Sequence, residues 1–353
     1  MYDLVVVGTG PIGSHLASKF IEENEGSDVL LLEKGEVGKP LKGTGHVSTD
    51  LFNYIPKDES FVEKEIYGAE VHNRFGSYSF GKDRQTSYVI DRVEFDSFLL
   101  QRAKEKGVEF KKEKFLDYEA KKGKVKVETD EDIYESRLLA GCDGPQSDVR
   151  TAAGLDGPDK FLHGIFTNQI EVGPIEQDYV ELFLGASKDF FGWKVPREES
   201  FEYGLAVELG KDSREALERF SEKEGFNITD VYSGLIPVNP PEKTYKGRTF
   251  LCGDAAGQVK PFSGGGLVYG MTSAEIAAEE IDPEDATTVE NYEEAWREEL
   301  EHEIKLGNRL RKMYKLPFWL RAPPLWIGEK MSQEAHMDKP SSLFRYEGDK
   351  TSS

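Results

Sequence analysis

Three glycines near the start of the chain have the spacing of a phosphate-binding loop. Gly8, Gly10 and Gly13 form the pattern GxGxxG directly after residues 3–7, a short apolar run rich in β-branched valine that is typical of a strand. Gly8 permits a tight turn off the strand, and Gly10 lets a pyrophosphate approach the backbone. Gly13 lets the helix that follows pack against the sheet. This pattern predicts a loop that binds the phosphates of a dinucleotide.

A carboxylate stands where a dinucleotide-binding unit needs one. The helix is predicted to begin near Pro11 and Ile12, where free N–H groups and the helix dipole favour a phosphate. The next strand, residues 28–32, ends in Glu33, and Lys34 follows it in the same predicted site. Glu33 can accept hydrogen bonds from both ribose hydroxyls of an adenosine and would repel a 2′-phosphate. The site therefore suits FAD or NAD better than NADP.

Two further segments join a strand to a helix beside this loop. In residues 87–103, Arg92 stands just after a strand, where its side chain can reach the flavin or the pyrophosphate of FAD. The alternative for Arg92 is a surface arginine at the start of a helix. In residues 138–150, a buried strand ends in Asp143 and Gly144, a turn pair that can let the backbone approach the cofactor.

A run of glycines in residues 248–281 predicts the flavin side of the site. Asp254 follows a strand, and its carboxylate is placed to bind the ribityl chain. Ten residues later a glycine run opens a helix of small residues, whose N-terminus favours the negative charge that develops on a reduced flavin. The residues at this helix start are Gly264, Gly265, Gly266 and Leu267.

The composition limits the classes of function. The 353 residues are enough for two domains, and no apolar stretch of about 18 residues predicts a membrane span. The net charge of −21 argues against a nucleic-acid partner. Only Cys142 and Cys252 are present, outside any CxxC pair, so neither a metal nor a disulfide is expected. The chain opens directly into a strand without signal-peptide features, which predicts a cytoplasmic protein.

The order of predicted elements indicates an α/β fold. We expect a Rossmann-like, discontinuous FAD-binding domain, a β-rich substrate domain and a C-terminal helical segment with a polar tail. The expected boundaries are 1–50, 85–155 and 245–282 for the FAD-binding domain, 51–84 and 156–244 for the substrate domain, and 283–353 for the C-terminal region.

The motifs together resemble a known family. GTGPIGS, DRVEFDSFL, GCDGPQSDVR and GDAAGQVKPFSGGG, in this order, resemble the FAD-dependent geranylgeranyl reductase family, within the para-hydroxybenzoate-hydroxylase-type flavoprotein fold. The resemblance covers about residues 1–315, and KPFSGGGL with the helix at residues 291–312 is its more specific part. It implies bound FAD, an isoprenoid lipid substrate and an unidentified electron donor. Family members reduce isolated double bonds of geranylgeranyl chains, in archaea on digeranylgeranylglycerol phospholipids.

The resemblance also implies a substrate wall. Reductases of this family carry a signature resembling PxxYxWxFP, which falls on residues 188–196. Trp193 and Pro196 match it, Phe191 keeps the ring of the tyrosine without its hydroxyl, and Val195 replaces phenylalanine. Such a wall is apolar, as an isoprenoid requires, because each buried CH₂ contributes about 0.8 kcal/mol. The alternative for Trp193 is the core of a sheet.

The source of the proton for such a reduction is less defined. Many archaeal relatives carry a cysteine after Lys-Pro-x-x, where this chain has Gly43. His46, just beyond Gly45 of the predicted cofactor loop, is the candidate catalytic residue because an imidazole titrates near neutrality. The alternative for His46 is a structural histidine.

The segment from Lys305 to Ile327 predicts a peripheral contact with the inner face of the cell membrane. It carries no acidic residue in a strongly acidic chain. Its basic residues are interleaved with aromatic types that settle at the headgroup boundary. The alternative is that the aromatic residues form a packed core while the basic residues meet acidic groups. The segment contains Lys305, Arg309, Arg311, Lys312, Lys315 and Arg321, with Tyr314, Phe318, Trp319 and Trp326.

Two other functions stay open at this point. A flavin monooxygenase or halogenase has the same fold, and residues 191–196 faintly resemble the halogenase pattern WxWxIP without its first tryptophan. A prenyl-binding escort protein has a related fold, but Glu33, Asp254 and the glycine run argue for bound flavin and against it. An electron-transfer-flavoprotein dehydrogenase is disfavoured because the cysteines for an iron–sulfur cluster are absent.

Overall fold

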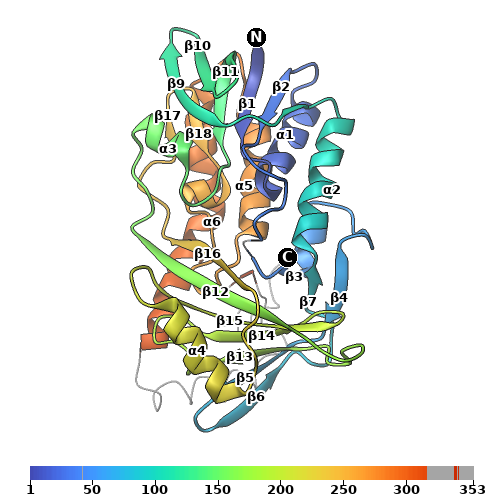
Figure 1. The fold of residues 1–353 in the computed structure, drawn as a ribbon. Coiled ribbons are helices and arrows are strands. Elements are labelled where there is room, and N and C mark those ends of the chain that lie inside the picture. Colours follow the sequence, from blue (N-terminus) through green and yellow to red (C-terminus); the bar gives the residue numbers. More distant parts are fainter. Residues whose placement is uncertain (42, 316–337, 340, 342–353) are drawn as a thin grey trace, which may run out of the picture.

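A largely parallel sheet forms the upper half of the molecule in Figure 1. The computed structural model describes residues 1–41, 43–315, 338–339 and 341. The eight-stranded sheet runs β17-β18-β11-β1-β2-β8, with β10 beside β11 and β9 beside β10. Its central strands are continuous apolar runs because both faces of the sheet are covered. The bounds are β1 (Tyr2–Val7), β2 (Val29–Leu32), β8 (Glu109–Lys111), β9 (Phe115–Lys121), β10 (Lys124–Thr129), β11 (Ile133–Gly141), β17 (Tyr245–Lys246) and β18 (Thr249–Leu251).

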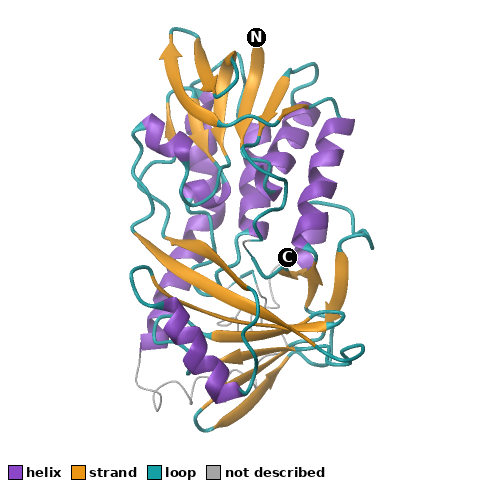
Figure 2. Ribbon diagram, in the orientation of Figure 1, coloured by secondary structure: helices purple, strands orange, loops and turns teal. Residues whose placement is uncertain are grey.

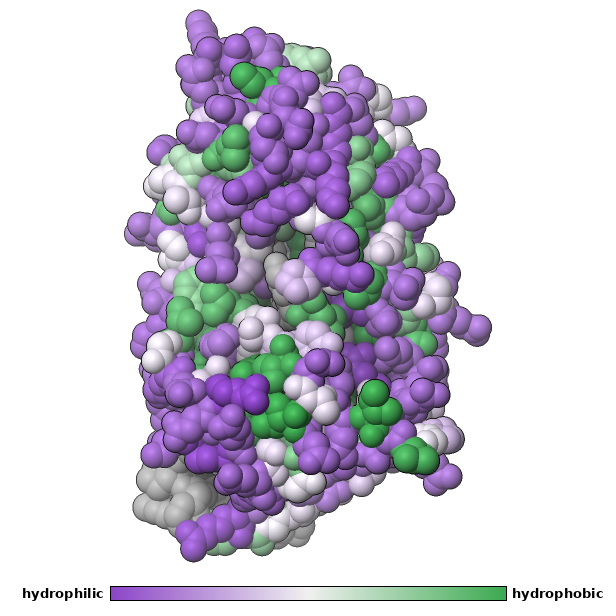
Figure 3. Space-filling model, viewed as in Figure 1, coloured by the Kyte–Doolittle hydropathy of each residue, from purple (hydrophilic) through white to green (hydrophobic). Residues whose placement is uncertain are grey.

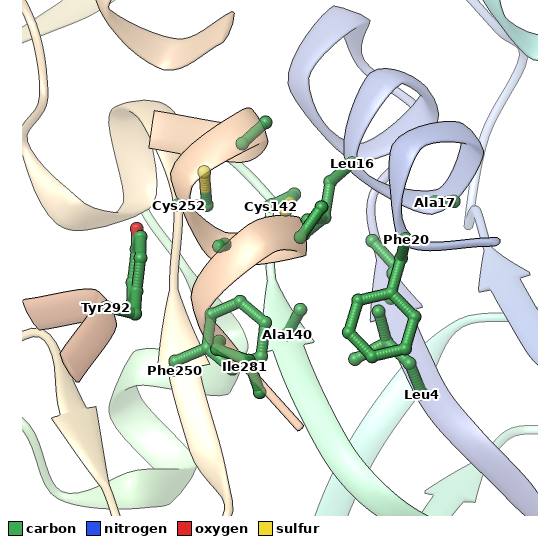
Figure 4. Close-up of a cluster of buried hydrophobic side chains, with 14 of the residues drawn as sticks. Leu4, Leu16, Ala17, Phe20, Ala140, Cys142, Phe250, Cys252, Ile281 and Tyr292 are labelled. Carbon is green, nitrogen blue, oxygen red and sulfur yellow. The ribbon is translucent and has the colours of Figure 1, made fainter. Parts of the chain in front are cut away.

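Helices cover one face of this sheet, and strands with a short helix cover the other (Figure 2). Leu4, Ala140 and Phe250 pack with side chains of the helices in one core, part of which Figure 4 shows. Val5 and Leu139 pack on the opposite face against β9 and β10. Neighbouring residues enter different cores because side chains alternate along a strand. The helices are α1 (Pro11–Glu23), α2 (Arg92–Glu105), α3 (Asp148–Ala153), α5 (Leu267–Glu280) and α6 (Thr288–Arg311).

A seven-stranded, mostly antiparallel sheet forms the lower half of the molecule (Figure 1). Its order is β16-β12-β15-β14-β13-β5-β6, and only β13 and β5 are parallel neighbours. Helix α4 (Ser213–Glu224) covers one face, while Phe166, Trp193 and Ala206 point to the opposite face. The bounds are β5 (Ala69–Asn73), β6 (Gly76–Phe80), β12 (Lys160–Ile170), β13 (Val180–Phe183), β14 (Gly192–Pro196), β15 (Ser200–Glu208) and β16 (Val231–Val238).

A small third sheet takes strands from both sides of a predicted boundary. It runs β3 (His46–Ser48), β7 (Ser87–Ile90), β4 (Val62–Ile66). Residues 51–84, assigned together to the substrate domain, are thus divided between two sheets, since β4 pairs with β7 while β5 and β6 join the seven-stranded sheet. The domain boundaries stay a prediction.

The α/β class predicted from the sequence is confirmed. The helix expected over residues 291–312 corresponds to α6. The surface in Figure 3 is mostly hydrophilic, with hydrophobic patches on its lower half, and the exposed apolar residues of the protein include Ile170, Val172 and Val231. Within the described residues, no helix combines the length and apolar content needed to cross a membrane.

Candidate functional site

The glycine loop after β1 combines tight packing with one open position. A Cβ on Gly13 would lie 1.9 Å from the carbonyl oxygen of Gly8, and a Cβ on Gly8, at φ +103°, would lie 2.5 Å from the carbonyl oxygen of Cys142. A Cβ on Gly10 would meet no atom within 4 Å. Gly10 also precedes α1 at Pro11, and no side chain caps that helix. The open face of Gly10 beside uncapped N–H groups fits a pyrophosphate.

The carboxylate of Glu33 is fixed against this loop. Its Oε2 accepts hydrogen bonds from the backbone N–H and the hydroxyl of Thr9, at 3.0 and 2.9 Å, and its Oε1 accepts one from the N–H of Gly35 at 3.0 Å. The carboxylate oxygens retain capacity for ribose hydroxyls, because two oxygens offer about four lone-pair sites. Lys34 instead forms an exposed ion pair with Asp148 at 3.4 Å, which makes it the weaker cofactor candidate.

Asp143 and Gly144 form the predicted turn beside the glycine loop. Gly144 has φ +86°, and Asp143 lies against Gly8. The Oδ2 of Asp143 accepts hydrogen bonds from the N–H groups of Asp148 and Val149 at 2.7 and 3.1 Å, so it also holds the start of α3. Its buried Oδ1 has no hydrogen-bond partner within the described structure. Burial raises the pKa of this carboxyl group.

Arg92 lies under the loop that precedes β3. Its guanidinium forms an ion pair with the buried Asp96 at 3.2 Å. A Cβ on Gly43 would come within 3.1 Å of Nη1 of Arg92, and Gly45, at φ +72°, lies so close to the carbonyl of Ile90 that a Cβ would be 2.2 Å from its oxygen. The structure therefore brings Arg92 and Gly45 together, and the ion pair orients the arginine.

The glycine run folds into a tight turn at the start of α5. Gly264, at φ +76°, donates its N–H to the carbonyl of Lys260 at 2.8 Å, and Lys260 donates its N–H to Gly265 at 3.0 Å. A Cβ on Gly266 would lie 2.8 Å from Oδ1 of Asp254, which places that carboxylate beside the helix start. This segment thus brings Asp254 and the predicted helix N-terminus together.

Helix α5 begins at Leu267, directly after the glycine run where the helix was predicted to start, and its N-cap carries no side-chain hydrogen bond. Its small residues allow a close approach to α1, because a Cβ on Gly270 would lie 2.5 Å from Cδ1 of Ile12. Ile12 therefore packs between α1 and α5, and its side chain serves the scaffold of the loop.

An aromatic cluster lies beside the glycine run. Phe190 and Phe191 stack with ring centroids 4.1 Å apart, and Trp193 meets Phe191 edge-on at 6.4 Å. Tyr314 stacks on Phe262 at 5.3 Å and contacts both phenylalanines edge-on. A Cβ on Gly264 would be 3.4 Å from Phe190, so the cluster adjoins the loop.

The other predicted wall residue lies farther along the strand. Pro196 ends β14, buried opposite Phe201, and Trp193 is buried in the face of the sheet that is opposite α4. The structure thus supports both views of Trp193, since the ring is part of a core and that core adjoins the predicted flavin side.

Two residues that support Trp193 were missed in the sequence. A Cβ on Gly204 would lie 2.4 Å from Cζ2 of Trp193, so only a glycine lets the indole lie flat across β15. The buried Glu202 accepts a hydrogen bond from the indole N–H at 2.9 Å. A glycine and a glutamate inside an otherwise apolar strand were the available signal.

Contrary to the expectation from the sequence, His46 does not titrate near neutrality. Its Nε2 lies 2.8 Å from the hydroxyl of Ser87. Burial, with the nearby Lys260, lowers the pKa of His46 to about 4. The imidazole is therefore neutral near pH 7 and does not hold the extra proton of a general acid. A catalytic role for His46 stays a prediction without that support.

The structure describes residues 305–315 of the basic segment, which runs from Lys305 to Ile327, and these residues contact other parts of the protein. Lys305 pairs with Glu301 at 2.6 Å, Lys315 pairs with Glu208, and Tyr314 is buried in the aromatic cluster. These contacts favour the packing alternative for these three residues. Phe318, Trp319, Arg321 and Trp326 lie outside the described residues.

Comparison with known proteins identifies the cofactor. A family model described as an FAD binding domain matches residues 1–240. A digeranylgeranylglycerophospholipid reductase of Methanopyrus kandleri is 31% identical over 351 positions, covering 89% of this chain and 86% of that protein.

Solved structures share the fold. A geranylgeranyl bacteriochlorophyll reductase-like protein of Thermoplasma acidophilum has a TM-score of 0.86 at 22% identity, covering 97% of this chain and 94% of the other. A variant of the halogenase PltM in complex with FAD has a TM-score of 0.72 at 14% identity, covering 94% and 82%. The FAD predicted from the four motifs together is confirmed by the family model.

Proposed function

The chain belongs to the FAD-dependent geranylgeranyl reductase family and is an FAD-dependent oxidoreductase, and we propose that it saturates isolated C=C bonds of geranylgeranyl chains on archaeal isoprenoid ether lipids. The observation that carries this proposal is the aromatic cluster of Phe190, Phe191, Trp193, Phe262 and Tyr314 against the glycine run of the flavin side. An isolated alkene has no polar handle, so a site for it must rely on apolar contact.

The cofactor half, which is the eight-stranded sheet with its helices and loops, would bind and orient FAD. In this proposal Glu33 would bind the ribose, the open face of Gly10 would accept the pyrophosphate, and Asp254 would bind the ribityl chain. FAD supplies the two-electron reduction when it is bound. The uncapped start of α5 at Leu267 favours the negative charge of the reduced state.

The sheet half, which is the seven-stranded sheet with α4, would supply an apolar, water-poor wall. Trp193 and Phe191 are buried in the aromatic cluster, which adjoins the glycine run through Phe190, and there they would orient a prenyl chain and exclude water. Each CH₂ that the chain buries contributes about 0.8 kcal/mol, so several isoprene units give substantial binding without hydrogen bonds.

A lipid substrate also gives a reason for contact with a membrane surface. Arg309 and Lys312 are exposed near the end of α6, at the start of the basic segment. Each cation near an anionic leaflet is worth about 1 kcal/mol. Arg309→Glu with Lys312→Glu should weaken co-sedimentation with anionic vesicles at low salt, whereas Lys223→Glu on α4 serves as the control. Equal binding of both variants to the vesicles would favour the alternative that the aromatic residues form a packed core and the basic residues meet acidic groups.

The function is tested with lipid and a chemical reductant. Dithionite-reduced protein is incubated anaerobically with geranylgeranylated glycerophospholipid, and the lipids are analysed by mass spectrometry. We expect products heavier by two hydrogens for each double bond, in an assay that assumes no natural donor. Intact lipid with fully reduced flavin would refute the proposal. Oxygen-dependent modification of an aromatic substrate instead would favour the monooxygenase or halogenase alternative.

A further inference from the structure

A buried charge network lies behind Trp193. The guanidinium of Arg197 donates to Glu63 at 2.6 Å, to Glu202 at 3.2 Å and to the carbonyl oxygen of Thr44 at 2.7 Å. The other carboxylate oxygen of Glu202 accepts the indole N–H of Trp193 at 2.9 Å. The side chain of Arg197 is 11% exposed and that of Glu202 is 0% exposed. One arginine thus connects an indole ring to a backbone carbonyl through a buried carboxylate.

The network joins three parts of the fold that meet at the site. Glu63 comes from β4 of the three-stranded sheet, and Glu202 comes from β15 of the seven-stranded sheet. Thr44 lies between Gly43 and Gly45, in the loop that packs on Arg92. The same guanidinium therefore fixes the sheet half and a loop of the cofactor half relative to each other.

Stability alone does not account for these buried charges. Two carboxylates face one guanidinium, and burial raises the pKa of Glu202 and of Glu63 even though Arg197 opposes the shift. Buried ion pairs are often neutral or unfavourable compared with apolar residues of the same volume. An arginine is suited to the place because its planar fork donates in several fixed directions at once.

We propose that Arg197 and Glu202 are positioning residues of the reductase site, which set the plane of Trp193 and the register of the loop at Thr44 against it. The inference rests on the proposed function and deepens it. Neither residue takes part in the redox step. They act through the indole ring that faces the substrate and through the loop beside the cofactor.

The opposite face of the same sheet provides a matched control. Glu181 on β13 pairs with Lys194 at 2.8 Å and with His72 at 2.8 Å. This cluster is also a mostly buried carboxylate, with a lysine and a histidine as its partners, and Lys194 is the direct neighbour of Trp193 on β14. Because side chains alternate, Lys194 points away from the aromatic cluster. Glu181→Gln therefore removes a comparable charge without reaching the site.

The experiment compares Glu202→Gln, Arg197→Lys and Glu181→Gln in the FAD-loaded protein. Glutamine at 202 can still accept the indole N–H but no longer neutralises Arg197, and lysine at 197 cannot reach three acceptors in fixed directions. We expect both site variants to lower kcat for lipid reduction about tenfold, since small misplacements at a site cost this much or more. The KM should change less than kcat, and FAD content and melting temperature should match those of Glu181→Gln.

Flavin spectra separate this inference from the proposed function. Arg197→Lys should shift the visible absorption of bound FAD, because the loop at Thr44 is released, whereas Glu181→Gln should not. Unchanged kcat in both folded site variants would overturn the inference while the function stands. An equal loss in Glu181→Gln would also overturn it. If the unsubstituted protein reduces no lipid, the proposed function fails, and an unshifted flavin spectrum of Arg197→Lys would refute the positioning role independently.

Discussion

The two halves of the molecule build their parts of the site by different means. In the cofactor half, backbone meets backbone, as at Gly13, where a Cβ would lie 1.9 Å from the carbonyl oxygen of Gly8. In the sheet half, large side chains meet each other, as at Trp193 and Phe191. Backbone contacts leave no room for adjustment, whereas a side-chain cluster can repack after a change. Substitutions at these backbone contacts should therefore act almost all-or-none, whereas substitutions in the side-chain cluster should act by degrees.

The largest effect is expected at Gly13. Gly13→Ala forces backbone apart between β1 and α1, so we expect loss of FAD together with loss of folded protein. Gly10→Ala is the matched control, because its Cβ meets no atom within 4 Å. That variant should fold and keep its melting temperature while binding less FAD. A folded, FAD-loaded Gly13→Ala, seen by circular dichroism and flavin absorbance, would contradict the comparison.

A graded effect is expected at Trp193. Trp193→Ala should destabilise the protein by about 3–5 kcal/mol, the usual cost of removing a buried tryptophan, and should impair lipid reduction more than FAD content. Tyr203→Ala is the control, since Tyr203 stacks on Phe226 on the opposite face of the sheet. Denaturant unfolding measures the stability of both variants, and lipid reduction measures their turnover. Equal losses of turnover in both variants would assign Trp193 to the core alone.

A smaller effect is expected at Glu33. Glu33→Lys should weaken FAD binding by about 1–3 kcal/mol, the scale of lost charge-assisted hydrogen bonds. Glu36→Lys, which changes the exposed partner of Lys39, should leave affinity nearly unchanged. Flavin fluorescence titration measures both. An unaltered affinity of Glu33→Lys for FAD would show that the adenosine does not bind at Glu33.

Gly265 tests where the two halves meet. The obstacle to a side chain there is the end of the Lys260 side chain, with Cε 2.8 Å from a Cβ, and not backbone. Gly265→Val should therefore fold, and the FAD that it retains should have a lower reduction potential, by an amount equivalent to about 0.3–1 kcal/mol of helix-dipole stabilisation. Gly185→Val, in open space, is the control. An unchanged reduction potential at full FAD occupancy would show that the start of α5 does not lie next to the flavin.

The smallest effect is expected at His46. Its pKa of about 4 is lowered from an ordinary 6.5, so the unfolded chain binds more protons between these values. The native state is therefore destabilised as the pH falls from 6.5 towards 4, and His46→Gln should lessen that loss. At pH 7 lipid turnover should change little. A large loss of turnover at pH 7 with normal FAD would restore His46 as a catalytic residue.

The difference between the halves also decides what could be predicted from the sequence. Gly8, Gly10 and Gly13 obey a backbone geometry that fixes residue type and spacing, so the loop was placed in advance. A helix start at residues 264–266 was predicted for the same reason, and α5 begins at the next residue, Leu267. Elements of this kind depend on neighbours in the chain.

The parts that were missed depend on residues far apart in the chain. Arg197 meets Glu63 and Thr44 only after the three sheets assemble. Its neighbours in the sequence do not indicate that its side chain is buried. Gly204 is required only because Trp193 lies across it from the neighbouring strand. The pKa of His46 depends on burial and on Lys260, which follow from the fold.

One measurement tests the division of roles most directly. FAD-loaded protein is reduced stoichiometrically without oxygen, mixed with geranylgeranylated phospholipid, and followed by flavin reoxidation and lipid mass in a single turnover. We predict that the lipid reoxidises the flavin and gains two hydrogens, and that Trp193→Ala slows this step at full FAD occupancy while Tyr203→Ala does not. Reoxidation that is independent of the lipid, or equal rates in both variants, would contradict the account.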